Sequence, residues 1–245
     1  MSKYRWKFLE LHGKTIRSAN GDMSWKIGEW NEVDKDTIQL CHNGLHCSKT
    51  IYDAFSYVQG NILAKVEVAG SSEISDDKEA YQKMRIVKAY KWTKKDSVAL
   101  AIFSAELCLD RFEKLYPDDK RPRQAIEAAK AVLLHDTAKN RSALFIAESA
   151  AWSASVSVAE PAARSAARSA VFAVSTLFAV FAAESANESA IVSAASDLFA
   201  ADSANESAAR SAASDLYAAR SNIRNQTIKK IEKWLVNHVQ EMEEL

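Results

Sequence analysis

Glycine and proline are scarce in this sequence and unevenly placed. The 245 residues include six glycines and three prolines, and no glycine follows Gly70. Glycine supplies the positive-φ positions that tight turns require, so turns and sheet are expected in the first third of the chain. We therefore predict an α+β protein with two domains: a small α+β domain over residues 1–95, and an α-helical bundle or stack over residues 96–245.

The sequence also has few cysteines, no net charge and only short apolar runs. Three cysteines make no disulfide framework and are typical of a reducing cytoplasm. Thirty-two basic and 32 acidic residues leave no net charge to attract nucleic acid or an anionic membrane. The first ten residues lack the apolar segment of a signal peptide, and the uncharged stretch 169–183 is shorter than the roughly 20 residues of a membrane span. We expect a protein of the bacterial cytoplasm with no membrane partner, no nucleic-acid partner and no cofactor.

Alanine and serine dominate residues 162–219. Two adjacent windows, 184–201 and 202–219, are identical at 14 of 18 positions. Eighteen residues make about five helical turns, so each repeated side chain returns to the same helix face. Ser185 and Ser203 each precede a glutamate by three residues, which is the pattern of a helix-starting capping box. Several short packed helices are the favoured structure, and one long helix is the alternative.

Local patterns indicate further elements on either side of these repeats. Alternating apolar residues predict strands at 4–8, 37–41, 62–68 and 84–92, and residues 24–30, with two tryptophans around Gly28, are a candidate irregular strand. Asn43-Gly44 predicts a type I′ hairpin, followed by a short helix that begins after Ser48 and ends at Gly60. Helical spacing of apolar residues predicts helices at 93–117, 122–134, 137–159 and 220–243.

The turn and helix at residues 115–129 read LYPDDKRPRQAIEAA. This motif, the alanine-rich helices after it and a final amphipathic helix with Trp234 resemble a phage and bacterial family of immunity proteins, over residues 95–240. Residues 40–48 and 62–70 are similar to a domain of prophage proteins. The resemblance implies a phage or prophage product that neutralises a toxin or a host defence complex.

Four charged residues in the same turn are candidates for binding a partner protein. Arginine forks suit partner carboxylates, so Asp118, Asp119, Arg121 and Arg123 could form an exposed recognition corner. The alternative is an internal ion-pair network that holds two helices together.

A cluster of potential metal ligands lies at residues 41–47, where Cys41 and His46 are the candidate pair. A structural zinc site needs four converging ligands. Successive residues of a strand point to opposite faces, so at most two ligands could converge here. A hairpin with one polar and one buried face is the preferred interpretation, and no metal is expected.

His46, Tyr57 and Glu67 follow one another in the order found in ADP-ribosyltransferases, which they faintly resemble. That resemblance implies that His46 and Tyr57 hold nicotinamide and that Glu67 assists transfer. The alternative gives each residue a structural role in the hairpin, helix and strand.

Three functional classes remain open from the sequence. The favoured one is a phage-encoded, non-enzymatic protein that binds and inhibits a bacterial host protein or complex, such as a toxin or a CRISPR effector. The second is a transferase that uses the N-terminal domain. The third is a phage structural protein that forms homo-oligomers through its Ala/Ser faces.

Overall fold

The chain forms two compact units in the computed structural model, which describes residues 3–58, 60–157 and 225–245. The first unit combines Met1–Thr93 with Glu232–Leu245, and the second comprises Lys94–Ile231. The repeats at 184–201 and 202–219 lie outside the described residues, so their stacked short helices stay a prediction.

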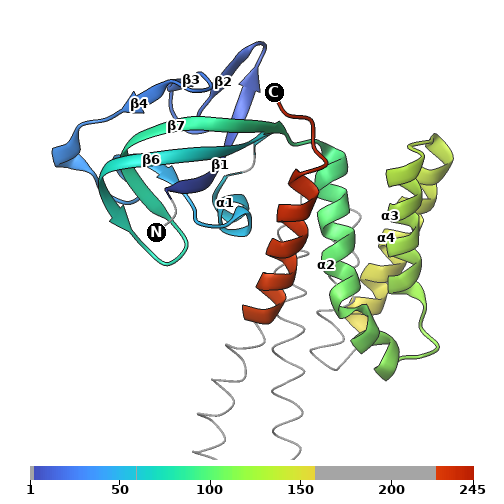
Figure 1. The fold of residues 1–245 in the computed structure, drawn as a ribbon. Helices are drawn as coiled ribbons and strands as arrows, with labels where there is room; N and C mark the ends of the chain where they lie inside the picture. The colour runs from blue at the N-terminus through green and yellow to red at the C-terminus, as the bar shows by residue number, and fades with distance from the viewer. Residues whose placement is uncertain (1–2, 59, 158–224) are drawn as a thin grey trace, which may run out of the picture. The chain divides into compact units, whose positions relative to one another are not determined.

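A seven-stranded antiparallel sheet dominates the first unit (Figure 1). Two long strands, β6 and β7, form its central hairpin, and β1 pairs with β6. The order is β3-β2-β1-β6-β7-β4, with β5 also paired to β7. The strand bounds are β1 Tyr4–His12, β2 Thr15–Arg17, β3 Ser24–Trp25, β4 Trp30–Glu32, β5 Leu45–Cys47, β6 Ile62–Ile74 and β7 Glu79–Lys91.

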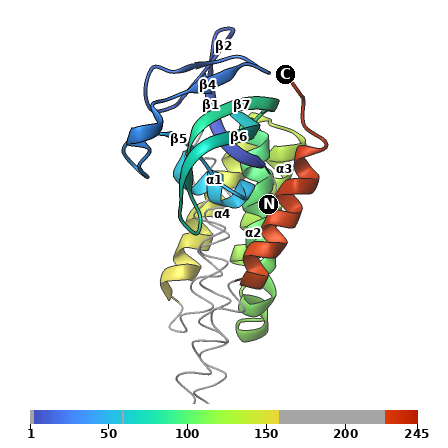
Figure 2. The same cartoon turned by 60° about the vertical axis from the view of Figure 1, so that its left-hand side comes forward.

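The sheet curls back on itself through β5. One side of β5 pairs with β7, from Leu45 opposite Tyr81 to Cys47 opposite Glu79. The next residue, Ser48, exchanges two backbone hydrogen bonds of 2.9 Å with Trp6 of β1. The ring β1–β6–β7–β5–β1 is therefore nearly closed and barrel-like, as the strong curvature of β6 and β7 shows in Figure 2. Such closure leaves few exposed edge groups in the ring.

The predicted α+β class is wrong for this unit, which is mainly β. Among its described residues, helix is limited to α1 Ile51–Tyr57, the short 3-10 turn η1 Lys35–Thr37 and the end of the helix at 225–239. The sequence patterns missed β2, and they left β3 and β4 inside one irregular segment, because strands of two or three residues carry no readable alternation. They also shortened β6 and β7, whose alternation breaks at register shifts after Lys65 and Ala69.

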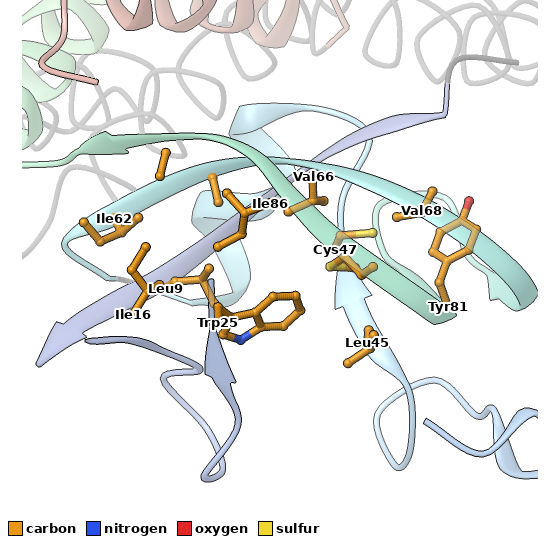
Figure 3. Close-up of a cluster of buried hydrophobic side chains, with 13 residues drawn as sticks. Leu9, Ile16, Trp25, Leu45, Cys47, Ile62, Val66, Val68, Tyr81 and Ile86 are labelled. Carbon is orange, nitrogen blue, oxygen red and sulfur yellow. The ribbon is translucent and has the colours of Figure 1, made fainter. Parts of the chain in front are cut away.

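The core of the first unit fills the inside of the curled sheet. Thirteen buried side chains from six of the seven strands face one another there, and Trp25 of β3 spans the space between β1 and β5 (Figure 3). The alternation in β1 has an unexpected orientation: the basic residues occupy the inner side. Arg5 is only 6% exposed, whereas the aromatic Tyr4 is 39% exposed. The acid Glu79 makes this arrangement stable because it supplies Arg5 with a buried counter-charge.

The hairpin predicted at Asn43-Gly44 is also wrong. Gln39 pairs with Asn43, and the turn comprises residues 40–42, with Cys41 at φ 67°. Leu45 and Cys47 both insert into the core, and this burial holds their strand against β7 rather than against residues 37–41.

The C-terminal segment completes the first unit. The Glu232 carboxylate accepts backbone N–H hydrogen bonds from Ile51 at 3.1 Å and Tyr52 at 2.9 Å, at the start of α1. Leu245 N–H donates to the Ala89 carbonyl at 2.9 Å, so the last residues extend the edge of β7. Residues more than 150 positions apart in the sequence therefore share one small fold.

The described part of the second unit is helical, and three helices lie where apolar spacing predicts them. They are α2 Lys94–Leu115, α3 Arg121–Leu134 and α4 Ala138–Ser157. Pro122 lies at the start of α3, where its missing N–H costs no helical hydrogen bond. Phe112, Ile126 and Ala129 are fully buried, as their spacing suggests. Within the ranges described, none of the helices has the length and apolar character needed to span a membrane.

Candidate functional site

A cleft of about 610 Å³ opens in the first unit, between the β2–β3 turn, the 41–46 segment and the end of α1. Its volume lies in the roughly 300–1,000 Å³ range of small-molecule sites. Apolar side chains form much of its wall: Phe8, Met23, Trp25, Val33, Leu45 and Val58. Ser18, Asn20 and Asn43 add polar groups. An apolar wall with a few polar groups is the usual composition of a ligand site.

Two lysines, Lys7 and Lys78, bring positive charge to this cleft. The Lys7 ammonium donates to the His46 carbonyl at 2.7 Å and lies 5.8 Å from the centre of the Trp25 ring. The Lys78 ammonium contacts Cys41 Sγ at 2.8 Å and lies 4.4 Å from the centre of the Tyr57 ring. In the described part of the chain, neither lysine forms an ion pair with a carboxylate. Their contacts are with a backbone carbonyl, a sulfur atom and two aromatic rings.

Burial is the main influence on Lys7. It lowers the pKa of the Lys7 ammonium from 10.5 to about 8, because the charged form loses its hydration. The other buried cation of this interior, Arg5, has a carboxylate partner in Glu79. Among the described residues, no carboxylate pairs with the Lys7 ammonium, so its charge is not neutralised by them.

Replacing Lys7 by methionine is expected to stabilise the protein. The folded pKa of Lys7 lies below its unfolded value, so its favourable contribution exists above pH 10.5 and is lost as pH falls through 8. At pH 7 the Lys7→Met variant should gain about 1–2 kcal/mol, after allowance for partial exposure and for the lost hydrogen bond to His46. Urea unfolding at pH 7 and at pH 10.5 measures this, and the gain should shrink at the higher pH.

A matched control for this measurement is Lys14→Met, in the exposed β1–β2 turn. It removes the same charge from the same unit and should change stability by less than about 0.5 kcal/mol. A Lys7→Met protein that is less stable than the parent at pH 7 would contradict the assignment of Lys7 as an uncompensated cation.

His46 and Cys41, the candidate metal pair, both line the cleft and contact each other. The Cys41 backbone N–H donates to His46 Nε2 at 3.1 Å, so this nitrogen's lone pair is already engaged. Burial and the two nearby lysines lower the pKa of His46, which keeps the imidazole neutral at pH 7. Among the described residues, no group of three or more His, Cys, Asp or Glu side chains is arranged to hold a metal ion.

The transferase resemblance singles out Tyr57 and Glu67 together with His46. In the structure, Tyr57 and Glu67 lie apart from each other. Tyr57 lines the cleft, and its hydroxyl donates to the Asp77 carboxylate at 2.5 Å. This hydrogen bond raises the pKa of Tyr57 to about 12. Glu67 is not among the cleft-lining residues: it is bound by Lys3 at 2.6 Å and by Arg85 at 2.6 Å. The structure thus brings two of the three residues together.

The four charged residues of the 115–129 motif form local ion pairs. Arg121 binds the Asp119 carboxylate with two hydrogen bonds of 2.8 and 2.6 Å. Arg123 binds Glu113 of α2, which joins α2 to α3. Asp118 lies exposed in the turn. This arrangement occupies both arginine forks within the chain.

Sequence reasoning missed Lys7, Lys78 and Trp25 as site residues. Lys7 belongs to the polar half of the alternating residues 4–8, and Lys78 follows Asp76 and Asp77 in a polar segment. Glu79, the one acid of β7, gives no signal for these residues, because it pairs with Arg5 and Lys49.

Comparison with known sequences adds a family match for part of the chain. Residues 12–95 match a domain of unknown function, DUF7666. The match runs from the end of β1 to the start of α2, so it includes Trp25, His46 and Lys78 but not Lys7. No curated protein and no solved structure matches this chain.

Proposed function

We propose that the protein acts by binding and not by catalysis. The observation that supports this most directly is the state of the ionisable groups at the cleft. His46 Nε2 accepts a backbone hydrogen bond, and the Tyr57 hydroxyl is bound to Asp77. Glu67 is held in ion pairs away from the cleft. General acid–base chemistry needs a group that can exchange a proton with substrate, and these three are otherwise engaged.

The proposed target is a bacterial host protein or complex, such as a toxin or a CRISPR effector, met in the bacterial cytoplasm. The resemblance of residues 95–240 to immunity proteins supports a phage product with this role. The second unit also exposes large apolar side chains: Leu134 is 74% exposed, Phe145 70% and Ile146 69%. Large exposed apolar side chains are a feature of protein-interaction sites, and Phe145 and Ile146 are consecutive residues of α4.

A single added charge on α4 should remove target binding. Phe145→Glu is expected to lower capture of the target from an infected bacterial lysate by at least tenfold, because interface centres exclude unpaired charge. Quantitative mass spectrometry of the captured proteins is the measurement. Gln124→Glu, at an exposed position of α3, adds the same charge and should leave capture unchanged.

Two results would count against the proposal. Equal capture by the parent and Phe145→Glu proteins would remove α4 from the interface. Loss of biological activity in a folded His46→Ala, Glu67→Gln double variant that still captures the target would favour the transferase alternative.

A further inference from the structure

The cleft of the first unit carries an unbalanced positive charge. Lys7 and Lys78 line it, and Asp22 is the acid among its described lining residues. The Asp77 carboxylate, beside the cleft, accepts a hydrogen bond from the Tyr57 hydroxyl, and His46 is neutral at pH 7. Deeper in the same interior, Arg5 and Glu79 neutralise each other, and Lys49 lies 3.7 Å from the same carboxylate. The neighbouring Cys47 thiol is protonated because burial raises its pKa to about 12. At neutral pH the charges of the two lysines that line the cleft therefore favour a negatively charged occupant.

A negatively charged occupant would offset the cost of holding the Lys7 charge inside the fold. The Lys7 ammonium has a carbonyl and an aromatic ring as neighbours, and both are neutral. A buried charge without a counter-charge is costly, and a bound anion within about 4 Å would offset that cost. Lys78 lies at the same cleft with a thiol and a phenol ring beside its ammonium. Two amines to which the described part of the chain supplies no carboxylate partner thus share one cavity.

The rest of the cleft wall sets the character of the ligand. Trp25 is 2% exposed and Leu45 is 4% exposed, so they form a packed floor, and Met23 and Val33 beside them are partly buried. A plain inorganic anion would leave this wall unfilled, whereas an apolar body would cover it.

We propose that this cleft binds a small organic anion, whose negative group is held by Lys7 and Lys78 and whose apolar body lies against Met23 and Trp25. The shared chemistry is an anionic head, either carboxylate or phosphate, on a flat apolar body. This inference deepens the proposed binding role by adding a small-molecule site, and it does not depend on the protein target of α4.

Calorimetric titration with matched probes tests the proposal. Indole-3-acetate is compared with its neutral amide, and phenyl phosphate with phenol, while acetate and inorganic phosphate represent the bare heads. We expect at least one anionic probe to bind at least tenfold more tightly than its neutral counterpart. The bare heads should bind more weakly than the complete probes, and the relative affinities of carboxylate and phosphate identify the head.

Variants identify the groups responsible. Lys7→Met and Lys78→Met should each abolish the preference for the anion, whereas Lys14→Met should keep it. Binding should also take up protons at pH 8, since an anion beside Lys7 raises the fraction of the charged form. Titrations in triethanolamine and Tris buffers, which hold no anion of the proposed class and whose ionisation enthalpies differ, measure that uptake, and it should vanish in Lys7→Met.

Several outcomes would overturn the proposal. These are equal affinity for charged and neutral probes, an unchanged anion preference in Lys7→Met, or no binding of either anionic probe at millimolar concentration. Since Lys7→Met is expected to be more stable than the parent, a loss of binding cannot be ascribed to unfolding. Capture of the protein target by the parent and Phe145→Glu proteins is measured separately, so the two proposals can fail independently.

Discussion

Replacing Glu79 by alanine is expected to lower the free energy of unfolding by about 3–5 kcal/mol, because it leaves a buried charge without its partner. Glu79 is fully buried, and Arg5 is 6% exposed. The Glu79 carboxylate accepts hydrogen bonds from two nitrogens of the Arg5 guanidinium and, at 2.8 Å, from the Tyr81 hydroxyl. Urea unfolding at pH 7, followed by tryptophan fluorescence, measures the loss.

The double variant Arg5→Met, Glu79→Leu shows whether the loss of stability in Glu79→Ala comes from the unpaired charge or from the packing around it. Removing both charges should recover most of the lost stability, since a buried pair and a well-packed apolar pair are often nearly equivalent. Glu32→Ala is the exposed control: its ion pair with Lys83 lies at the surface and should contribute less than about 1 kcal/mol. A Glu79→Ala loss no larger than the Glu32→Ala loss would refute the buried-pair interpretation.

Alanine at Gly60 should be equally damaging, for a steric reason. A Cβ atom there would lie 2.2 Å from the Leu9 carbonyl oxygen and 2.8 Å from the Leu9 carbonyl carbon. Leu9 is fully buried in β1 and paired with Ile62 of β6, so its backbone cannot move aside without breaking the sheet. We expect a loss of about 3 kcal/mol or more, at the upper end of overpacking costs. Thermal unfolding followed by circular dichroism measures it.

Gly13→Ala is the matched control for this prediction. Gly13 has φ +63° and open space around the position of a Cβ, so its replacement tests backbone conformation without a clash. Its cost should stay at about 1–2 kcal/mol, the usual penalty for a left-handed residue. If Gly13→Ala proves more damaging than Gly60→Ala, the close approach of Gly60 to Leu9 is not a constraint on the fold.

The sequence predicts the helices of the second unit better than the sheet of the first. Helix α3 could be placed because Ile126 and Ala129 repeat at helical spacing between a proline and the end of the apolar pattern. Strands β3 and β4 have only two and three residues, and their pairing depends on partners far away in the sequence. Local periodicity contains no information about such partners.

The cleft could be predicted only in part, and for a related reason. His46 and Tyr57 could be singled out from their residue types, but Glu67 faces other partners on a different part of the sheet. Lys7 escaped notice because basic residues in an alternating strand usually face solvent. Its inward position follows from how β1 is covered on both sides, with Phe8 packed against Phe55 and Trp92 on one side and Trp25 on the other.

The dependence of α1 on Glu232 has a consequence during synthesis. The carboxylate that binds the first turn of α1 leaves the ribosome 180 residues after Tyr52 does. Until then, α1 and the exposed edge of β7 lack the partners that the finished protein gives them. A nascent chain stalled before residue 232 should therefore be cut by protease near residues 50–58, and a chain whose residues 232–245 have left the ribosome should resist the same enzyme.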